Sequence, residues 1–356
     1  MSSGDVIVYA GAGSSHSWTW LADLFEMKGI INARFLDSKA FIESLSDRPT
    51  AVILSGGDGF AIGSALRGEG FLKLKEYIAG GGVYVGICAG AYLPLPSSLE
   101  PFSQFNISST KIENIDCKIS PLKDTPPRVA ISYGRCAIVH PVRGEIELDH
   151  VGSRLKAPIF GGPVFKEPQP DGVVLRYRDF TPNTEFQLGE QFARDTVLGR
   201  PAAVLCRHGD GELLLFGPHL EHPSFPDANR VFMDLLSLGG SKVRKVDSGP
   251  PRPELARSIA DLKVAIVGLE NRSFLVGRKL WDGSRYMELV HAIEKRTWSL
   301  DDRPSQELAR DLDAVRCNII RVNVGVESDV DQSTQLLVEC ARRCVDNHFC
   351  RLAESR

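Results

Sequence analysis

The sequence of 356 residues contains neither a long uninterrupted apolar run nor a strong excess of charge. No stretch reaches the roughly 18 apolar residues that a membrane-spanning helix needs, and no basic segment precedes the first apolar stretch. We therefore expect no membrane span and no signal peptide. The formal net charge of -3 gives no support to a nucleic-acid or membrane-surface partner, and we predict neither.

Cysteine is too scarce for a disulfide framework. The chain has 8 cysteines, and in a protein of this size we interpret them as reduced thiols and predict a cytoplasmic location. Cys340, Cys344 and Cys350 lie at nearly helical spacing, which helix packing explains as well as a metal site does. We predict no metal and no other cofactor.

A dinucleotide-binding signature is present only in part. Residues 11–15, Gly-Ala-Gly-Ser-Ser, follow an apolar run over residues 5–10. The third glycine and the acidic residue of the dinucleotide fingerprint are missing. A tight turn is the default interpretation of this loop, and nucleotide binding is the alternative.

What the sequence does contain is a cysteine placed between glycines. Residues 81–92 read Gly-Gly-Val-Tyr-Val-Gly-Ile-Cys-Ala-Gly-Ala-Tyr, so that Cys88 follows an apolar run and has a glycine two residues away on each side. This pattern predicts a nucleophile elbow, a strained turn that accepts only small neighbours. At the amino end of a helix, the helix dipole would favour the reactive thiolate. The alternative is an ordinary buried cysteine.

The first part of the chain alternates strands and helices. We expect strands over residues 5–10, 31–36, 51–54 and 83–87, and helices over residues 18–28, 40–45 and 71–79. Such alternation implies a parallel sheet whose ligands bind beyond the carboxyl ends of the strands. The three glycine-rich loops fall on that edge. In the second, Gly56 and Gly57 leave the backbone open to donate to an oxyanion, although a flexible turn is the alternative.

Beyond residue 97 the pattern changes to short alternating runs among prolines. The runs cover residues 136–142, 145–149, 158–165 and 173–177. A hairpin follows over residues 202–207 and 212–216 around an Asp-Gly turn, and then a helix over residues 229–238. We therefore predict a flavodoxin-like, doubly wound, mostly parallel sheet with an antiparallel β insertion.

A histidine and a glutamate follow the last of these strands. In an extended chain, Glu221 lies on the same side as His219 and can hold its imidazole in one tautomer. Together with Cys88, these residues make a complete triad for acyl transfer. His222 is the competing base, but it would point to the other face. A solvated polar loop and a metal site are the other interpretations.

Taken together, the elbow, the Gly-Gly loop and the His-x-Glu motif resemble the class I glutamine amidotransferase superfamily over about residues 5–240. The sequence is most similar to the amidotransferase-like amino-terminal domain of eukaryotic biotin-protein ligases. The motifs are Val-Tyr-Ala-Gly-Ala-Gly (8–13), Gly-Ile-Cys-Ala-Gly-Ala-Tyr (86–92), Gly-Gly-Pro-Val-Phe (161–165) and Pro-His-Leu-Glu-His-Pro (218–223).

This resemblance implies a role for each matched residue. Cys88 would be the nucleophile, His219 the base and Glu221 the orienting acid. The backbone N–H groups of Gly57 and Ala89 would form the oxyanion hole.

The position four residues after the cysteine departs from the family pattern. Glutaminases usually have Gln there, whereas this chain has Tyr92. An aromatic wall would replace a hydrogen-bonding amide, unless the ring packs away from the cleft. Gly56, Asp58, Tyr92 and Gly162 are our candidate substrate-binding residues. We predict poor hydrolysis of free glutamine and better acceptance of a bulkier amide.

The last third of the chain has a different composition. A proline-rich linker is expected over residues 241–253, followed by a helical region over residues 254–356. Every predicted strand precedes Gly240, so an amino-terminal domain, residues 1–240, is expected to fold without the helical region. The helical appendage is a candidate for docking a protein partner or a second copy of the chain.

Two functions fit the sequence. The first is an amide hydrolase or amidotransferase-like enzyme that acts through a thioester on a small or peptide amide. The second is a catalytically silent ligand-binding or regulatory module of the biotin-protein ligase N-terminal type. The intact triad favours the first, and Tyr92 together with the missing acceptor domain favours the second.

Overall fold

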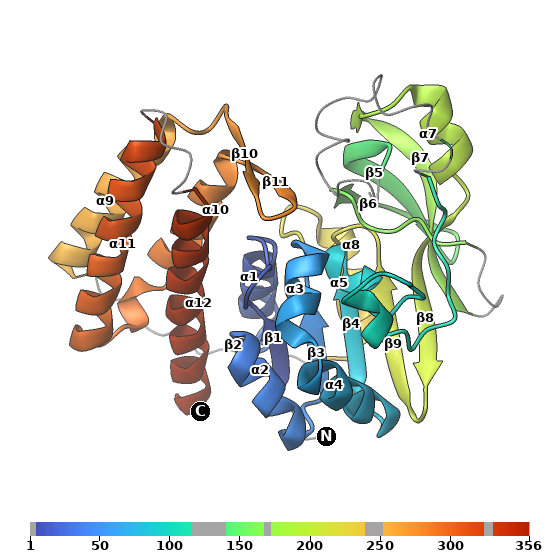
Figure 1. Cartoon of the computed structure of the whole chain (residues 1–356), viewed down its shortest axis with the longest axis horizontal. Coiled ribbons are helices and arrows are strands. Elements are labelled where there is room, and N and C mark those ends of the chain that lie inside the picture. Colours follow the sequence, from blue (N-terminus) through green and yellow to red (C-terminus); the bar gives the residue numbers. More distant parts are fainter. Residues whose placement is uncertain are drawn as a thin grey trace.

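The computed structural model describes residues 5–115, 118, 140–166, 172–238, 252–323 and 330–355. They form a central sheet flanked by helices, with a group of long helices along one side (Figure 1). Most of the predicted linker and most of the predicted run over residues 136–142 lie outside the described residues. Within the described part of the chain, no helix is both long and apolar enough to cross a membrane.

Nine strands form one sheet in the order β2-β1-β3-β4-β9-β8-β7-β5-β6. The parallel half contains β1 (Val6–Tyr9), β2 (Ala33–Leu36), β3 (Ala51–Leu54), β4 (Val83–Ile87) and β9 (Gly211–Phe216). The antiparallel half contains β5 (Val142–His150), β6 (Ser153–Ile159), β7 (Val173–Phe186) and β8 (Pro201–His208). The predicted mostly parallel sheet with an antiparallel insertion is confirmed, and the insertion continues the same sheet.

Helices cover both faces of the parallel half, and its strands are therefore apolar on both sides. One face packs on α1 (Trp18–Lys28) and α8 (Pro226–Leu236). The other packs on α2 (Ser38–Ser44), α3 (Gly59–Leu66) and α4 (Glu69–Ala79). Val8 and Tyr9, neighbours on β1, accordingly enter different hydrophobic cores.

Two helices that pack on the sheet were not expected from the sequence. Glycine weakens a helical pattern, and α3 begins with one and contains another, Gly63. Its start is stabilised by Asp58, whose side chain accepts hydrogen bonds from the N–H groups of Phe60 and Ala61 at 2.9 and 3.2 Å. The other unexpected helix is α7 (Glu190–Val197). The helix after Cys88, α5 (Ala89–Tyr92), has a single turn, as the prolines that follow it predict.

The carboxyl-terminal region is largely helical, as predicted, but it also contains a hairpin. Its helices are α9 (Pro253–Val267), α10 (Ser284–Glu294), α11 (Asp302–Asn323) and α12 (Val330–Glu354). Between α9 and α10, β10 (Ser273–Val276) and β11 (Lys279–Asp282) pair in an antiparallel hairpin. The expectation that every strand precedes Gly240 is therefore wrong. These strands are short, and their turn lacks the Asn-Gly or Asp-Gly signal.

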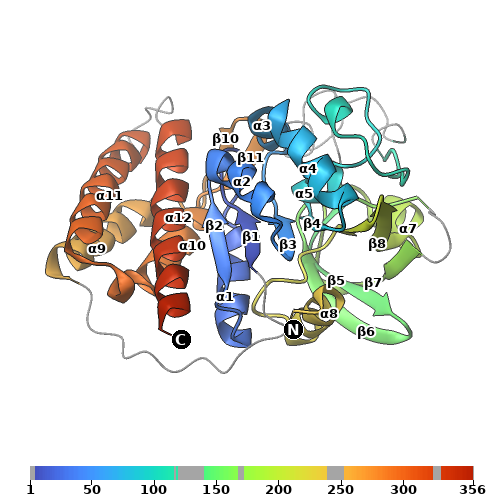
Figure 2. The same ribbon diagram turned by 90° about the horizontal axis from the view of Figure 1, so that it is seen from below.

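The helical region shares its core with the sheet. Helix α12 lies beside β2 in both views (Figures 1 and 2), and the rings of Phe35 and Phe349 are 5.1 Å apart between centroids. One continuous cluster of buried apolar side chains runs from the parallel strands through α1 to α9, α10, α11 and α12. The two regions are therefore stabilised by the same packing.

A buried arginine also connects the two regions. The Arg296 side chain is almost fully buried and pairs with Asp23 at 2.7 Å and Glu26 at 2.6 Å, both on α1. A buried guanidinium needs such partners because its desolvation is costly. The contact between α1 and the segment just after α10 thus combines ion pairs with apolar packing.

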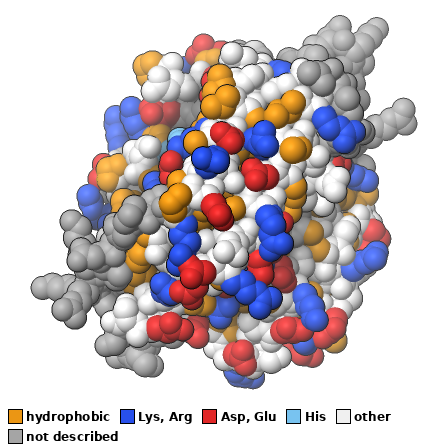
Figure 3. Space-filling view, turned by 90° about the vertical axis from the view of Figure 1, so that its left-hand side faces the viewer, with side chains coloured by type: hydrophobic (Ala, Val, Ile, Leu, Met, Phe, Trp, Pro, Cys, Tyr) orange, Lys and Arg blue, Asp and Glu red, His pale blue; other side chains and the backbone are white. Residues whose placement is uncertain are grey.

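The outer side of the helical region carries acidic and basic side chains in a mixed pattern, with apolar side chains scattered among them (Figure 3). Surfaces with both signs interspersed produce no strong field of one sign. Docking of a partner or a second copy on this region stays a prediction.

Candidate active site

The Cys88 turn has the geometry of a nucleophile elbow. Cys88 has φ +52° and ψ -108°, which L residues rarely adopt. A Cβ on Gly86 would lie 2.6 Å from the carbonyl oxygen of Gly90, and a Cβ on Gly90 would lie 1.9 Å from that of Leu54. Only glycine fits on either side of the cysteine, as the sequence pattern indicates.

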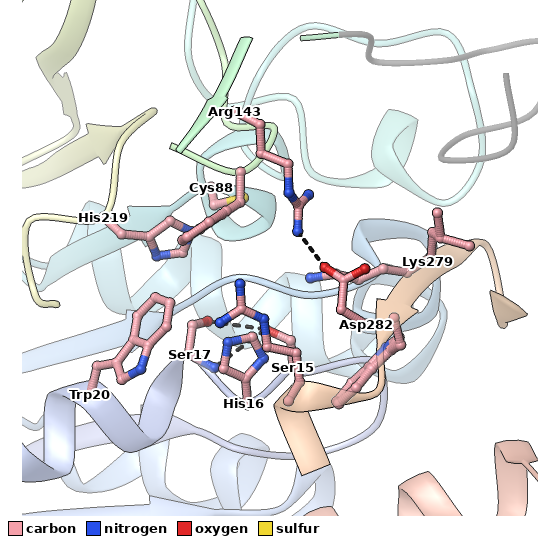
Figure 4. Close-up of a pocket in the computed structure, with 13 residues that line it drawn as sticks. Ser15, His16, Ser17, Trp20, Cys88, Arg143, His219, Lys279 and Asp282 are labelled. Carbon is pink, nitrogen blue, oxygen red and sulfur yellow. Dashed lines mark hydrogen bonds and ion pairs between the residues drawn. The ribbon is translucent and has the colours of Figure 1, made fainter. Parts of the chain in front are cut away.

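His219 and Glu221 follow β9, which pairs in parallel with β4. The carboxyl ends of the two strands therefore lie side by side. Nδ1 of His219 is 2.7 Å from Oε1 of Glu221, and the two side chains are 2% and 0% exposed. The His219 side chain lines the same cavity as the Cys88 thiol (Figure 4), and each group shifts the pKa of the other. The structure thus brings the three residues together in the order that acyl transfer needs.

The electrostatics favour a thiolate and an imidazolium. Burial raises the pKa of the Cys88 thiol, but the hydrogen bond and charge of His219 outweigh it. Smaller contributions come from Lys279 and the Ala89 N–H, and the pKa of Cys88 lies below its usual value. Burial lowers the pKa of His219, but Glu221 and Cys88 together raise it to about 9. The thiolate is the nucleophilic form of cysteine.

A row of hydroxyl groups leads to the Glu221 carboxylate. Ser55, which follows β3, donates to Oε1 of Glu221 at 3.4 Å. Oγ of Ser17 is 2.9 Å from Oγ of Ser55 and 3.1 Å from that of Ser15. Ser15 closes the glycine-rich loop after β1 and Ser17 lies just beyond it, so this segment contributes hydroxyl groups to the site, which the sequence did not predict.

The oxyanion hole stays a prediction. The Ala89 N–H lowers the pKa of the Cys88 thiol and so lies beside its sulfur. Gly57 forms an isolated bridge with Ser14, and a Cβ on Gly57 would lie 2.2 Å from the carbonyl oxygen of Gly13. The glycine is therefore required for the close approach of two loops. Donation from its N–H to an oxyanion stays a prediction.

The predicted substrate-binding glycines have different surroundings. A Cβ on Gly56 would lie 3.1 Å from Cε1 of His219, so Gly56 lies against the catalytic candidates. A Cβ on Gly162 would lie 1.8 Å from the carbonyl oxygen of Gly217. Gly162 therefore serves a close backbone contact.

Asp58 and Tyr92 are engaged in structural contacts. Besides capping α3, Asp58 accepts a hydrogen bond from the Arg278 N–H at 2.8 Å. Tyr92 is buried, and its hydroxyl donates to the carbonyl oxygen of Gly161 at 3.2 Å. Neither residue lines the cavity beside Cys88. The position of Tyr92 therefore gives no support to an aromatic wall in the pocket.

The hairpin of β10 and β11 covers the cavity beside Cys88 (Figure 4). The cavity volume is about 30 Å³, which is room for roughly two water molecules. The carboxyl-terminal region contributes Lys279, Leu280, Trp281, Asp282 and Arg285 to its lining. The remaining lining residues are Ser15, His16, Ser17, Trp20, Cys88, Arg143, Phe160 and His219.

Polar contacts hold the hairpin over the cavity. Arg143 of β5 pairs with Asp282 at 2.9 Å. The Arg278 guanidinium lies 4.3 Å from the centroid of the Phe60 ring, and the backbone of Arg278 is bonded to Asp58. The sequence did not predict Arg143, Lys279 or Arg285 as site residues.

Comparison with known proteins supports the predicted resemblance for the first part of the chain. Residues 4–100 match the family model described as biotin-protein ligase, N terminal. A Chlamydia muridarum protein described as uncharacterized is 25% identical over 236 residues, which is 62% of this chain and 82% of that protein. The matched residues 4–100 contain Cys88 but end before His219 and Glu221.

Solved structures show weaker similarity. A Thermoplasma acidophilum protein described as a GMP synthase subunit aligns with a TM-score of 0.37 and 14% identity, covering 66% of this chain and 94% of that one. A β-galactosidase from Bacillus circulans sp. alkalophilus aligns with a TM-score of 0.33 and 9% identity, covering 69% of this chain and 33% of that one.

Proposed function

We propose that the protein is a cysteine-dependent amide hydrolase or acyl transferase that works through a thioester. The observation that carries this proposal is the buried contact of one imidazole with both partners. Nδ1 of His219 lies 2.7 Å from the Glu221 carboxylate, and the imidazole shares a cavity and an electrostatic interaction with the Cys88 thiol. The strained elbow at Cys88 adds support, because such strain persists where the nucleophile must be presented.

The chemistry follows from these positions. The Cys88 thiolate attacks the amide carbonyl carbon, and the Ala89 and Gly57 N–H groups would stabilise the oxyanion. The His219 imidazolium gives its proton to the leaving nitrogen, the C–N bond breaks, and a thioester remains. Neutral His219 then takes a proton from water or an amine, which attacks the thioester and releases the thiolate. Glu221 keeps the imidazole in one tautomer throughout.

Covalent trapping at about pH 6 tests the proposal, because ordinary thiols are protonated there. We expect the glutamine analogue 6-diazo-5-oxo-norleucine, or another electrophile from a panel of amide analogues, to label Cys88 ahead of the other cysteines. Burial raises the pKa values of Cys340 and Cys344 to about 12, so these thiols should stay unlabelled. Peptide mapping reads the result, with Cys88→Ala as the control. Uniform labelling, or faster labelling of Cys350, would contradict the proposal.

The pH dependence should separate alkylation from turnover. The His219 proton is lost as the pH rises through its pKa of about 9, and the leaving nitrogen needs that proton. Amide hydrolysis should therefore fall above about pH 9, whereas alkylation of Cys88 by iodoacetamide should not fall. Both rates are measured across the same buffers. An alkylation rate that rises through about pH 8.5, as for an ordinary thiol, would show that His219 does not activate Cys88.

A catalytically silent ligand-binding module is the second candidate. The burial of the Cys88 thiol favours a binding module, because this residue is only 3% exposed. Such a module would bind the same analogues reversibly and show no increase in mass at Cys88.

A further inference from the structure

A buried histidine faces the cavity with its ring nitrogens unused. His16 is 7% exposed, and within the described part of the chain neither of its ring nitrogens has a hydrogen-bond partner. The carboxylate of Glu288 is 3.6 Å away from Nε2, beyond ordinary hydrogen-bond distance. Burial, with the charges of Arg285 and Lys279, lowers the pKa of His16 well below its usual value. The ring is thus neutral and keeps one N–H donor.

A lysine enters the same cavity from the hairpin. The Lys279 side chain extends from β11 into the cavity that contains Cys88 and His16 (Figure 4). Burial lowers the pKa of Lys279 to about 8, so the ammonium is still mostly protonated at neutral pH. Among the described residues, no carboxylate forms an ion pair with it within 4.0 Å. The charges of the Cys88 thiolate and Asp58 act on this ammonium, and an anionic ligand in the cavity would compensate the half-buried cation further.

The two arginines of the cavity are already engaged. Arg143 pairs with Asp282 and Arg285 pairs with Glu288. Both guanidinium groups also lie 5.1 Å from the centroid of the Phe160 ring. Lys279 is therefore the cation of this cavity that is best placed to receive a new anion.

We infer that the substrate carries a carboxylate beside the scissile amide, and that Lys279 and His16 bind this carboxylate while the carbonyl faces Cys88. This inference rests on the proposed function. It makes Lys279 a specificity-determining residue supplied by the carboxyl-terminal region, outside the part of the chain that the family model matches. Trp20 and Trp281, whose rings contact the His16 ring at 5.0 and 6.1 Å between centroids, would form the apolar walls of the carboxylate pocket.

Two alkylating reagents that differ in charge test the inference. Iodoacetate and iodoacetamide have the same reacting carbon, and with each the C–I bond breaks as the S–C bond forms. Both reach Cys88 through the same cavity, so any movement of the hairpin affects both reagents equally. Their rate ratio at Cys88 therefore cancels the thiolate population and the opening step. We expect Lys279→Gln to lower the iodoacetate to iodoacetamide ratio roughly ten-fold, because a charge-assisted hydrogen bond is lost.

Further variants define the result. Lys279→Arg should keep most of the ratio, and His16→Phe, which keeps an aromatic ring, should lower it about three-fold. Lys263→Gln removes the same charge from α9, where Lys263 pairs with Glu294, and should leave the ratio unchanged. An unchanged ratio in Lys279→Gln would overturn the inference alone. A Cys88 that reacts with neither reagent would overturn the proposed function, and the inference with it.

Discussion

Gly90→Ala is expected to destabilise the protein by about 3 kcal/mol, at the upper end for overpacking, and to abolish the reactivity of Cys88. The added Cβ would lie 1.9 Å from the carbonyl oxygen of Leu54. That neighbour is backbone in a central strand, so no side-chain rotation can relieve the clash. Either β3 or the turn that presents Cys88 must move. Urea unfolding and the alkylation rate of Cys88 measure the two effects.

Gly189→Ala is the matched control. The same atom is added at the N-cap of α7, where φ is -55° and no atom lies within 4 Å of the new Cβ. We expect a change within about 0.5 kcal/mol. Equal stability of the two variants would show that the elbow tolerates a side chain at this position, and the geometric basis of the proposed nucleophile would be lost.

A fragment that ends at residue 238 is expected to lose its native packing. Removing the helical region uncovers Phe35, which is fully buried in the whole chain and packs on Phe349 of α12. A large apolar side chain contributes about 1.5–3 kcal/mol when buried, and a few such losses approach a total stability of about 5–15 kcal/mol. The fragment should keep its far-UV circular dichroism, lose the near-UV signal and bind a hydrophobic dye.

The control for the truncation is a chain that is cut between the two regions but keeps both pieces. A protease site placed between residues 241 and 251 cuts the chain but keeps every packing side chain. We expect the two pieces to elute together in size-exclusion chromatography, since they share one core. A fragment with a sharp, cooperative unfolding transition of its own would contradict this expectation and support the sequence-based domain prediction.

The parts of the site that could be predicted are those with local signals. Gly86 and Gly90 reveal the elbow because their spacing around Cys88 is a local pattern, and Gly86 avoids a clash with Gly90 inside the same turn. His219 and Glu221 lie two residues apart at the end of a strand, so their pairing also follows from chain geometry. The alternation of strands and helices similarly indicates the parallel sheet.

The rest depends on contacts between distant parts of the chain. Asp58 follows a strand of the parallel sheet, and its position predicts a role in substrate binding. Its carboxylate instead caps α3 and bonds to Arg278, which lies 220 residues away. No periodic pattern in the sequence near either residue predicts such a contact. The hairpin was missed for the same reason, because two four-residue strands around Gly277 carry little pattern of their own.

The small volume under the hairpin has a consequence for the fate of a thioester. A cavity of about 30 Å³ admits water but no amine much larger than ammonia. Under the proposed function, a thioester on Cys88 would therefore be open to water or ammonia while the hairpin stays in place. Transfer to a larger acceptor would require the hairpin to move, and the hydrogen bond between Asp58 and Arg278 is one of the contacts that this movement would break.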